Sequence, residues 1–242
     1  MERENGPISP AEAASVLQWW SDAGVDCLVD EAPRDWLRPE PRPAAASVEA
    51  AAAAPAEELP AQLDLFRAWL AESADLPFAA PGAPRVCPSG DPHSGLMLLT
   101  DMPTEQDCAE ATLLTGEAGR LFDRMLTAIG RDRSSIYLAS LSCLKSPSGS
   151  LAPDSAQRCA ALARHHIGLA APKAVLLLGD NTAKALLGMP TIQARGRWHE
   201  IATHAGQISA VASFHPSYLL GQPAAKRHAW ADLQMLMERL AQ

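Results

Sequence analysis

The sequence predicts an α/β fold, a three-layer α/β/α sandwich with a central four-stranded parallel sheet. Two observations lead to it. Short, nearly continuous apolar runs suit strands that are covered on both faces, and segments with helical apolar spacing lie between them. Strand and helix alternate along the chain, which predicts parallel strands with helices on both sides. A ligand is then expected beyond the carboxyl ends of the strands.

The individual elements follow from their apolar patterns. The expected strands are residues 96–100, 136–141, 175–179 and 208–214, which read LMLLT, IYLASL, VLLLG and ISAVASF. The expected helices are residues 117–129, 154–169, 181–187 and 224–240. In the first and last of these helices, apolar residues recur three and four positions apart, so each helix presents one apolar stripe to the sheet. His165 and His166, inside the second helix, are expected at its surface or its end.

Composition divides the chain into three parts. Residues 1–40 contain a short segment with helical spacing around Trp19 and Trp20, and we expect a short helical element there. Residues 41–60 are rich in Ala, Pro and Glu and lack the side chains of a core, which predicts a linker. Residues 61–242 form the expected main domain, which is long enough to bury a core of its own.

Charge and cysteine content limit the function classes. The net charge is −8, but residues 1–75 carry 5 basic and 15 acidic side chains, which leaves +2 for the rest. The main domain can therefore meet DNA through a local patch, although it is no general polyanion binder. The polar, acidic start and the lack of a long apolar run favour a cytoplasmic protein that does not bind membranes, and we expect a monomer. Five cysteines without C-x-x-C spacing argue against a disulfide framework or a zinc ribbon.

The loop after the last expected strand, SFHPSYLLGQP, is the most informative segment. His215 leaves the strand end toward the ligand face, and Pro216 fixes the turn. Ser217 offers its hydroxyl and its N–H group to a phosphate, while Leu219 and Leu220 could fill the gap left by an extruded base. The alternative is a histidine beside a proline turn, with both leucines in the core.

A family resemblance favours the first alternative. HPSYLL resembles the second signature of the uracil-DNA glycosylase superfamily. Four further segments are similar, in the same order, to the bacterial iron-sulphur branch, known as family 4: VCPSGDP with LMLLTDMPTEQD, LLTGEAGRLFDRMLTAIG, PKAVLLLGDNTAKALLG and ARGRWHE. The chain thus resembles a divergent member of that branch, and residues 61–242 are its uracil-DNA glycosylase-like domain. The implied reaction is hydrolysis of the N-glycosidic bond of uracil, or of another deaminated base, after base flipping.

The resemblance implies two catalytic residues. The histidine of the second signature, here His215, donates a hydrogen bond to uracil O2 as negative charge develops on the leaving base. The family's G-E-A-P-G motif corresponds to residues 100–104, so that Asp101 keeps a carboxylate at the acidic position. Met102 falls where other glycosylase branches place a water-activating aspartate, and a thioether cannot activate water.

The implied base pocket is altered. Asp107 takes the family's second acidic position, which contacts the base or excludes a 5-methyl group. Leu114 replaces the aromatic residue that stacks on uracil, and Ser140 replaces the asparagine that reads the uracil edge. We therefore expect weaker or altered base selection.

The implied cluster site is degenerate. The family holds a four-iron four-sulphur cluster with four cysteines, two of them in an N-terminal C-x-x-C, and the corresponding region here, AWLAESADLPFAAPG, has no cysteine. Cys159 keeps its place, whereas the other late ligand falls on Leu144. The alternative is an alignment slipped by one residue, which places that ligand on Cys143, 16 residues before Cys159 as in the family, and still supplies only two ligands. Because such clusters are coordinated by four thiolates, we expect no cluster, no other cofactor and no metal.

Three functional hypotheses follow. The chain is an active N-glycosylase on DNA, a catalytically silent relative that still binds damaged or abasic DNA, or an interaction module that uses the acidic N-terminal part. HPSYLL favours the first hypothesis, whereas the substitutions at Met102, Leu114 and Ser140 favour the second.

Overall fold

The computed structural model describes residues 59–147 and 151–240, together with Ser15 and Trp19. The helical element expected in residues 1–40 and nearly all of the expected linker lie outside the described residues. From Glu57 onward the chain forms one compact unit. No described helix has the length and apolar character needed to span a membrane.

The sheet has six strands in the order β1-β3-β2-β4-β6-β5. Its centre is the expected parallel set, β2 (Leu96–Thr100), β3 (Tyr137–Ser140), β4 (Ala174–Leu178) and β6 (Gly206–Ser213). The expected count of four strands is wrong, because antiparallel strands β1 (Ser89–Gly90) and β5 (Trp198–Thr203) form the two edges. Neither edge strand has a continuous apolar run: β1 is only two exposed residues, and β5 buries Ile201 alone.

Eight α-helices lie in the described residues beyond the N-terminal element. They are α2 (Leu63–Glu72), α3 (Glu105–Glu110), α4 (Gly116–Ala128), α5 (Pro153–Ala170), α6 (Asp180–Leu187), α7 (Thr191–Ala194), α8 (Pro216–Gly221) and α9 (Lys226–Leu240). Two short 3-10 helices, η1 (Arg133–Ser135) and η2 (Pro223–Ala225), join them. The four expected helices agree with α4, α5, α6 and α9 to within two residues at each end.

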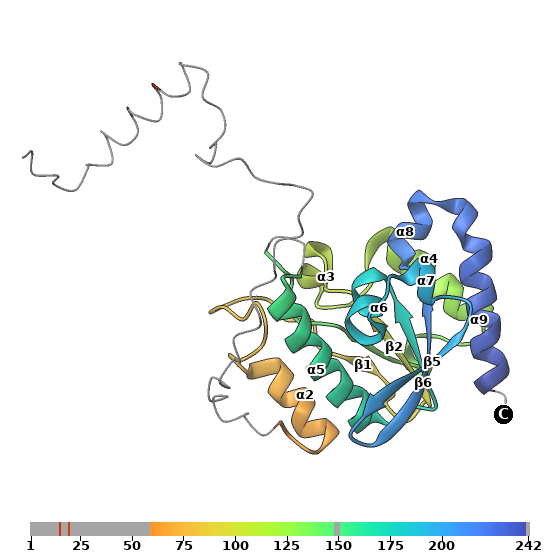
Figure 1. Cartoon of the computed structure of the whole chain (residues 1–242), viewed down its shortest axis with the longest axis horizontal. Helices are drawn as coiled ribbons and strands as arrows, with labels where there is room; N and C mark the ends of the chain where they lie inside the picture. Colours follow the sequence, from red (N-terminus) through yellow and green to blue (C-terminus); the bar gives the residue numbers. More distant parts are fainter. Residues whose placement is uncertain (1–14, 16–18, 20–58, 148–150, 241–242) are drawn as a thin grey trace, which may run out of the picture. The chain divides into compact units, whose positions relative to one another are not determined.

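Alternating side chains of β2 build the three layers (Figure 1). Met97 and Leu99 belong to the core cluster that contains residues of α5, α6 and α7. Leu96 and Leu98 belong to the other cluster, with residues of α4 and α9. Side chains of a strand point to opposite faces in turn, so this partition places helices on both sides of the sheet and confirms the α/β/α sandwich.

His166 lies in the core of the α5 layer, so its expected surface position is wrong. Its Nε2 is 2.8 Å from the hydroxyl of Tyr137 on β3, and its ring packs against Phe66 of α2. Burial lowers the pKa of His166 to about 3, so its imidazole is neutral in the folded protein. The histidine is buried because α2 covers this side of α5.

Candidate active site

The carboxyl ends of β2, β4 and β6 bring the central site residues together. Thr100 is the last residue of β2, Gly179 follows β4, and His215 follows β6 by two residues. β2 and β4 are neighbours although β3 lies between them in sequence, so the chain reverses its direction of travel across the sheet here. Ligands of parallel α/β sheets bind at such a point.

His215 is held at both ring nitrogens. Its Nδ1 accepts hydrogen bonds from the backbone N–H of Ser217 at 3.2 Å and from the Ser217 hydroxyl at 2.6 Å. An accepting Nδ1 leaves the proton on Nε2, which lies 3.1 Å from the hydroxyl of Thr100. Burial lowers the pKa of His215 to about 4, although the nearby Asp107 carboxylate opposes this shift. At neutral pH the ring is therefore a neutral donor through Nε2–H.

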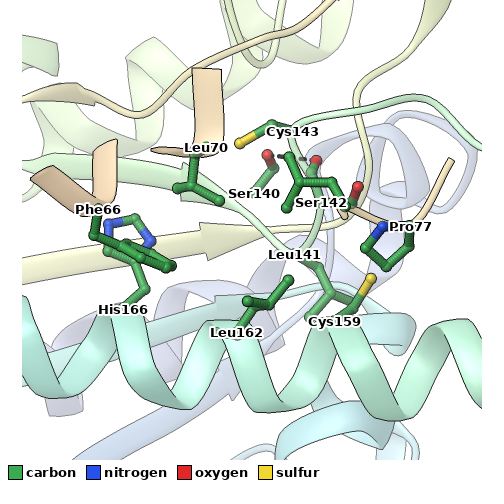
Figure 2. Close-up of a pocket in the computed structure, with 12 residues that line it drawn as sticks. Phe66, Leu70, Pro77, Ser140, Leu141, Ser142, Cys143, Cys159, Leu162 and His166 are labelled. Carbon is green, nitrogen blue, oxygen red and sulfur yellow. Dashed lines mark hydrogen bonds between the residues drawn. The ribbon is translucent and has the colours of Figure 1, made fainter. Parts of the chain in front are cut away.

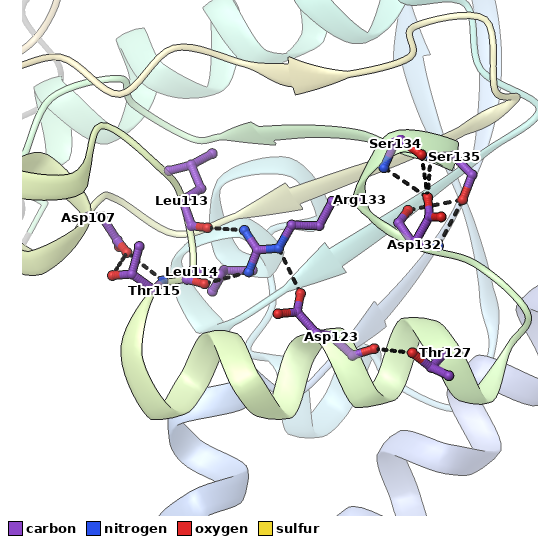
Figure 3. Close-up of polar contacts among 10 residues, drawn as sticks. All are labelled: Asp107, Leu113, Leu114, Thr115, Asp123, Thr127, Asp132, Arg133, Ser134 and Ser135. Carbon is purple, nitrogen blue, oxygen red and sulfur yellow. Dashed lines mark hydrogen bonds and ion pairs between the residues drawn. The ribbon is translucent and has the colours of Figure 1, made fainter.

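Both carboxylate oxygens of Asp107 accept hydrogen bonds from nearby backbone or side-chain groups, and Figure 3 shows those from Thr115. One oxygen accepts the N–H and the hydroxyl of Thr115 at 2.8 and 2.6 Å, and the other accepts the N–H of Thr104 at 2.9 Å as part of the α3 capping box. Burial acts to raise the pKa of Asp107, but these hydrogen bonds outweigh it and hold the pKa below its ordinary value. The carboxylate therefore braces the loop and stays charged near His215.

Asp101 turns toward the start of α6. Its Oδ1 accepts the N–H of Thr182 at 3.1 Å, its Oδ2 lies 3.4 Å from the side-chain amide of Asn181, and a Cβ added at Gly179 would clash with the carboxylate. Burial raises the pKa of Asp101 to about 6, against the opposing hydrogen bond from Thr182. The glycine at position 179 makes room for this carboxylate, whose ionisation falls in the range useful to a general base.

Leu114 does not offer an open face for stacking. It is only 4% exposed, packs in the same core cluster as Phe122 and has a left-handed backbone with φ of 55°. Arg133 holds this conformation, because its guanidinium donates to the carbonyls of Leu113 and Leu114, both at 2.7 Å, and pairs with Asp123 at 2.7 Å (Figure 3). The expected stacking surface is thus part of the core in this structure.

The residues of the second signature divide between core and surface. Pro216 is buried at the first position of α8, and Ser217 directs both its N–H and its hydroxyl to His215. Leu219 is 1% exposed and packs with Phe214 and α4, so the expectation that it reaches DNA is wrong. Leu220 is 39% exposed. One step along a helix turns a side chain by about 100°, which leaves Leu220 as the candidate wedge.

Ser140 lies in register with Thr100 at the ends of β3 and β2, but its hydroxyl is engaged elsewhere. Ser140 donates to the carbonyl of Ser142 at 2.7 Å and lines a separate small cavity beneath α2 (Figure 2). Met102 is half-buried between β2 and α3. The structure therefore brings His215 and Asp107 into one electrostatic environment and places Asp101 beside it, but Ser140 faces another part of the molecule.

Thr100 and Tyr218 belong to the site but escaped the sequence interpretation. Thr100 ends an apolar run and resembles an ordinary strand residue, yet its buried hydroxyl bonds the Nε2 of His215. Tyr218 stacks on Phe214, with ring centres 4.9 Å apart. The sequence did indicate that Thr100 could belong to the site. It replaces the first glycine of the family's G-E-A-P-G pattern and directly precedes the acidic residue, Asp101.

The corner that corresponds to the cluster site is filled with apolar side chains. Phe66 and Leu70 of α2 pack there with Leu76, Cys143 and Leu144, and the cavity that remains holds about 20 Å³, room for about one water (Figure 2). Burial raises the pKa of Cys143 to about 12 and that of Cys159 to about 11, so both are thiols. Among the described residues, no three His, Cys, Asp or Glu side chains form a metal-binding group. These residues do not fit an iron-sulphur cluster.

Comparisons with known proteins identify the family. The family profile described as Uracil DNA glycosylase superfamily matches residues 87–234. A type-4 uracil-DNA glycosylase of Archaeoglobus fulgidus is 19% identical over 156 residues, 62% of this chain and 78% of the relative. One of Pyrobaculum aerophilum is 22% identical over 153 residues, 60% of this chain and 78% of the relative. The fold, the strand-end histidine and these matches together show that the chain belongs to the uracil-DNA glycosylase superfamily.

Proposed function

We propose that the protein is a DNA repair N-glycosylase that hydrolyses the bond between deoxyribose and uracil, or another deaminated base. The observation that carries the proposal is the neutral His215, whose Nδ1 accepts from Ser217 so that Nε2 presents its proton at the strand ends. A positioned neutral donor stabilises charge that develops on a leaving base without first losing a proton to it.

The proposed reaction needs the base outside the helix. The target nucleotide is extruded, and Nε2–H of His215 exchanges the Thr100 hydroxyl for the carbonyl oxygen of the base. The bond from the sugar carbon to the base nitrogen breaks with its electron pair moving to the base. A water adds to the sugar carbon and gives a proton to the Asp101 carboxylate, and the base leaves as an anion held by His215.

One observation favours a second candidate, a silent relative that still binds DNA. The Thr100 hydroxyl satisfies Nε2 in the structure, and a glycine at this position, as in the family pattern, would leave Nε2 open. If this bond blocks the base, Thr100→Gly should activate an inert wild-type protein. If the base carbonyl readily displaces the Thr100 hydroxyl from Nε2, Thr100→Gly should change the rate by less than about threefold. That factor corresponds to about 0.6 kcal/mol, the low end of the net contribution of one hydrogen bond.

The test is incubation with an oligonucleotide that contains one uracil, followed by alkali to cleave abasic sites. We expect cleavage by the wild-type protein and a loss of about 100-fold or more in His215→Ala, with DNA affinity nearly unchanged, because the contact strengthens only as the base departs. Equal losses of affinity and rate would make His215 a binding residue. An inert wild type that still binds DNA, together with cleavage by Thr100→Gly, would support the silent relative with a blocked His215, whereas inertness of both would show that the Thr100 bond is not what blocks the reaction.

We also propose that the protein works without an iron-sulphur cluster. The region that corresponds to the family's first cysteine pair supplies Leu70 and Leu76 to the apolar corner beneath α2, and Leu144 stands where a later ligand is expected. The purified protein should be colourless, and growth with or without added iron should give the same activity. Absorbance near 400 nm with about four irons per chain would contradict this proposal.

A further inference from the structure

A pocket that His215 lines, and that Thr100 does not line, lies next to the candidate active site. It holds about 230 Å³ across the ends of β4 and β6, between α7 and α8. Its lining residues are Gly179, Asp180, Thr191, Ile192, Phe214, His215 and Tyr218. This volume is below that of most drug-sized sites and suits one small planar ring system. None of the catalytic roles proposed above uses the pocket, although it shares His215 with the active site.

The walls of the pocket combine stacking surface with an unused polar atom. Tyr218 is 49% exposed and stacks on Phe214 with an angle of 27° between the rings, while Ile192 of α7 is 67% exposed. The Arg195 guanidinium lies over the Phe214 ring, 5.6 Å from its centre, and donates a hydrogen bond to Asp232 at 2.9 Å, which helps to fix the position of Phe214. The buried hydroxyl of Thr191 has no hydrogen-bond partner among the described residues. A buried hydroxyl without a partner is costly unless a ligand satisfies it.

We infer that this pocket binds an unpaired nucleobase next to the target nucleotide, stacked on Tyr218 and hydrogen-bonded by Thr191. The inference rests on the proposed function, in which the target base replaces the Thr100 hydroxyl at Nε2 of His215, because Thr100 does not line this pocket. A neighbouring base of the same strand then enters the pocket. Aromatic stacking accepts every base, and one hydroxyl can donate or accept, so the pocket reads an unpaired base rather than a particular sequence.

The pocket predicts a preference for single-stranded DNA. A paired neighbour stays in its helix and must be unstacked before it can enter, whereas a base in a single strand is free to do so. The only acidic side chain among the lining residues, Asp180, is paired with Lys184 and with the N–H of Thr191, so it does not leave an isolated charge facing the strand. The preference therefore comes from base stacking rather than from a change in phosphate contacts.

The experiment measures the affinity of the full chain for single-stranded oligonucleotides by fluorescence anisotropy. The target is 2′-fluoro-2′-deoxyuridine, which resists cleavage, and its two neighbours are either thymidines or abasic tetrahydrofuran units. The variants are Tyr218→Ala, Tyr218→Phe and Thr191→Val. Trp230→Ala is the matched control, because Trp230 is an exposed aromatic residue of α9 that lines a different pocket. Thermal melting confirms that each variant is folded.

We expect Tyr218→Ala to weaken binding to the thymidine-flanked strand by about 10-fold, with Tyr218→Phe and Trp230→Ala within about twofold of wild type. On the abasic-flanked strand the wild type should lose the same factor, and Tyr218→Ala should lose nothing more. Thr191→Val should weaken only the thymidine-flanked strand, by about threefold. Comparable losses in Tyr218→Ala on both strands would overturn the inference and assign Tyr218 to support of His215.

Other outcomes separate this inference from the proposed function. If the wild type excises uracil but binds both strands equally, the pocket does not take a neighbouring base, and the function stands. If the flanking effect is present without excision, the pocket is a base site of a silent relative, and the function fails. Unchanged DNA affinity in every variant would overturn the inference and favour a protein side chain as the occupant.

Discussion

The ionisation of Asp101 predicts the pH dependence of excision. Burial raises its pKa from the ordinary 3.8 to about 6, and a general base works only when it is ionised. At pH 5 about one in eleven such carboxylates is ionised, so kcat/KM should lie about tenfold below its plateau at pH 7.5. A carboxylate with the ordinary pKa would leave the rate at pH 5 almost at the plateau. His215 stays neutral over this range because its pKa is about 4.

The assay is alkali-revealed cleavage of a uracil oligonucleotide from pH 4.5 to 8, with DNA affinity and circular dichroism recorded at each pH. Asp101→Asn should lower the plateau by about 100-fold or more and remove the break near pH 6. A flat wild-type profile between pH 5 and 7.5 in folded protein would refute the assignment. So would an Asp101→Asn variant that keeps a third of the wild-type rate.

The same substitution should change stability in the opposite direction. The folded-state pKa of Asp101 is above the unfolded one, so its protonated form stabilises the fold below about pH 3.8, and this contribution is lost as the pH rises through about 6. At pH 7 the ionised buried carboxylate costs on the order of 3 kcal/mol relative to its ordinary environment. Asp101→Asn should therefore melt at a higher temperature than wild type at pH 7, but not at pH 4.

Three further predictions concern stability. Phe66→Ala should lower the free energy of unfolding by about 3 to 5 kcal/mol in urea because it empties a fully buried site, while the exposed Leu65→Ala on the same helix should change it by less than about 0.5 kcal/mol. Below about pH 6.5 the unfolded chain protonates His166 but the folded chain does not, so His166 should contribute a loss of about 1.4 kcal/mol per pH unit down to about pH 3, and this contribution is the difference in slope between wild type and His166→Gln, because Asp101 and His215 also titrate in this range. Arg133→Ala should cost about 2 kcal/mol because it strips the donors from two loop carbonyls, whereas Arg120→Ala, which breaks an exposed pair, should cost less than about 0.5 kcal/mol; equal effects would contradict the role given to the Arg133 contacts.

The centre of the fold was predictable because its signals are local. Each buried strand is an apolar run, and each long helix has its own apolar stripe. The edge strands lacked such a signal, since β5 is defined by its pairing with β6 rather than by its own pattern. His166 was misplaced for the same kind of reason, because its burial depends on α2, which lies far away in sequence.

The site was predictable at His215 and less so around it. A histidine between a buried strand and a proline turn has its position fixed by neighbours in sequence. Leu114 differs, because its left-handed backbone depends on donors from Arg133, 19 residues away. For Asp107, a local signal existed: Thr104 precedes it by three residues, the spacing of a capping box, which indicates a bracing role as well as a pocket position.

The apolar packing of α2 against α5 makes the stability of this corner depend on temperature. Phe66, Leu70 and Leu162 pack together in one hydrophobic cluster. Such contacts form as the chain folds and need no bound ligand. Their contribution weakens on cooling and in urea, and a chelator does not act on it. In proteins whose fold depends on a bound metal, by contrast, metal binding and folding are thermodynamically coupled. The α2 corner should therefore be among the first parts to loosen in the cold, and its amide protons should report that opening by hydrogen exchange.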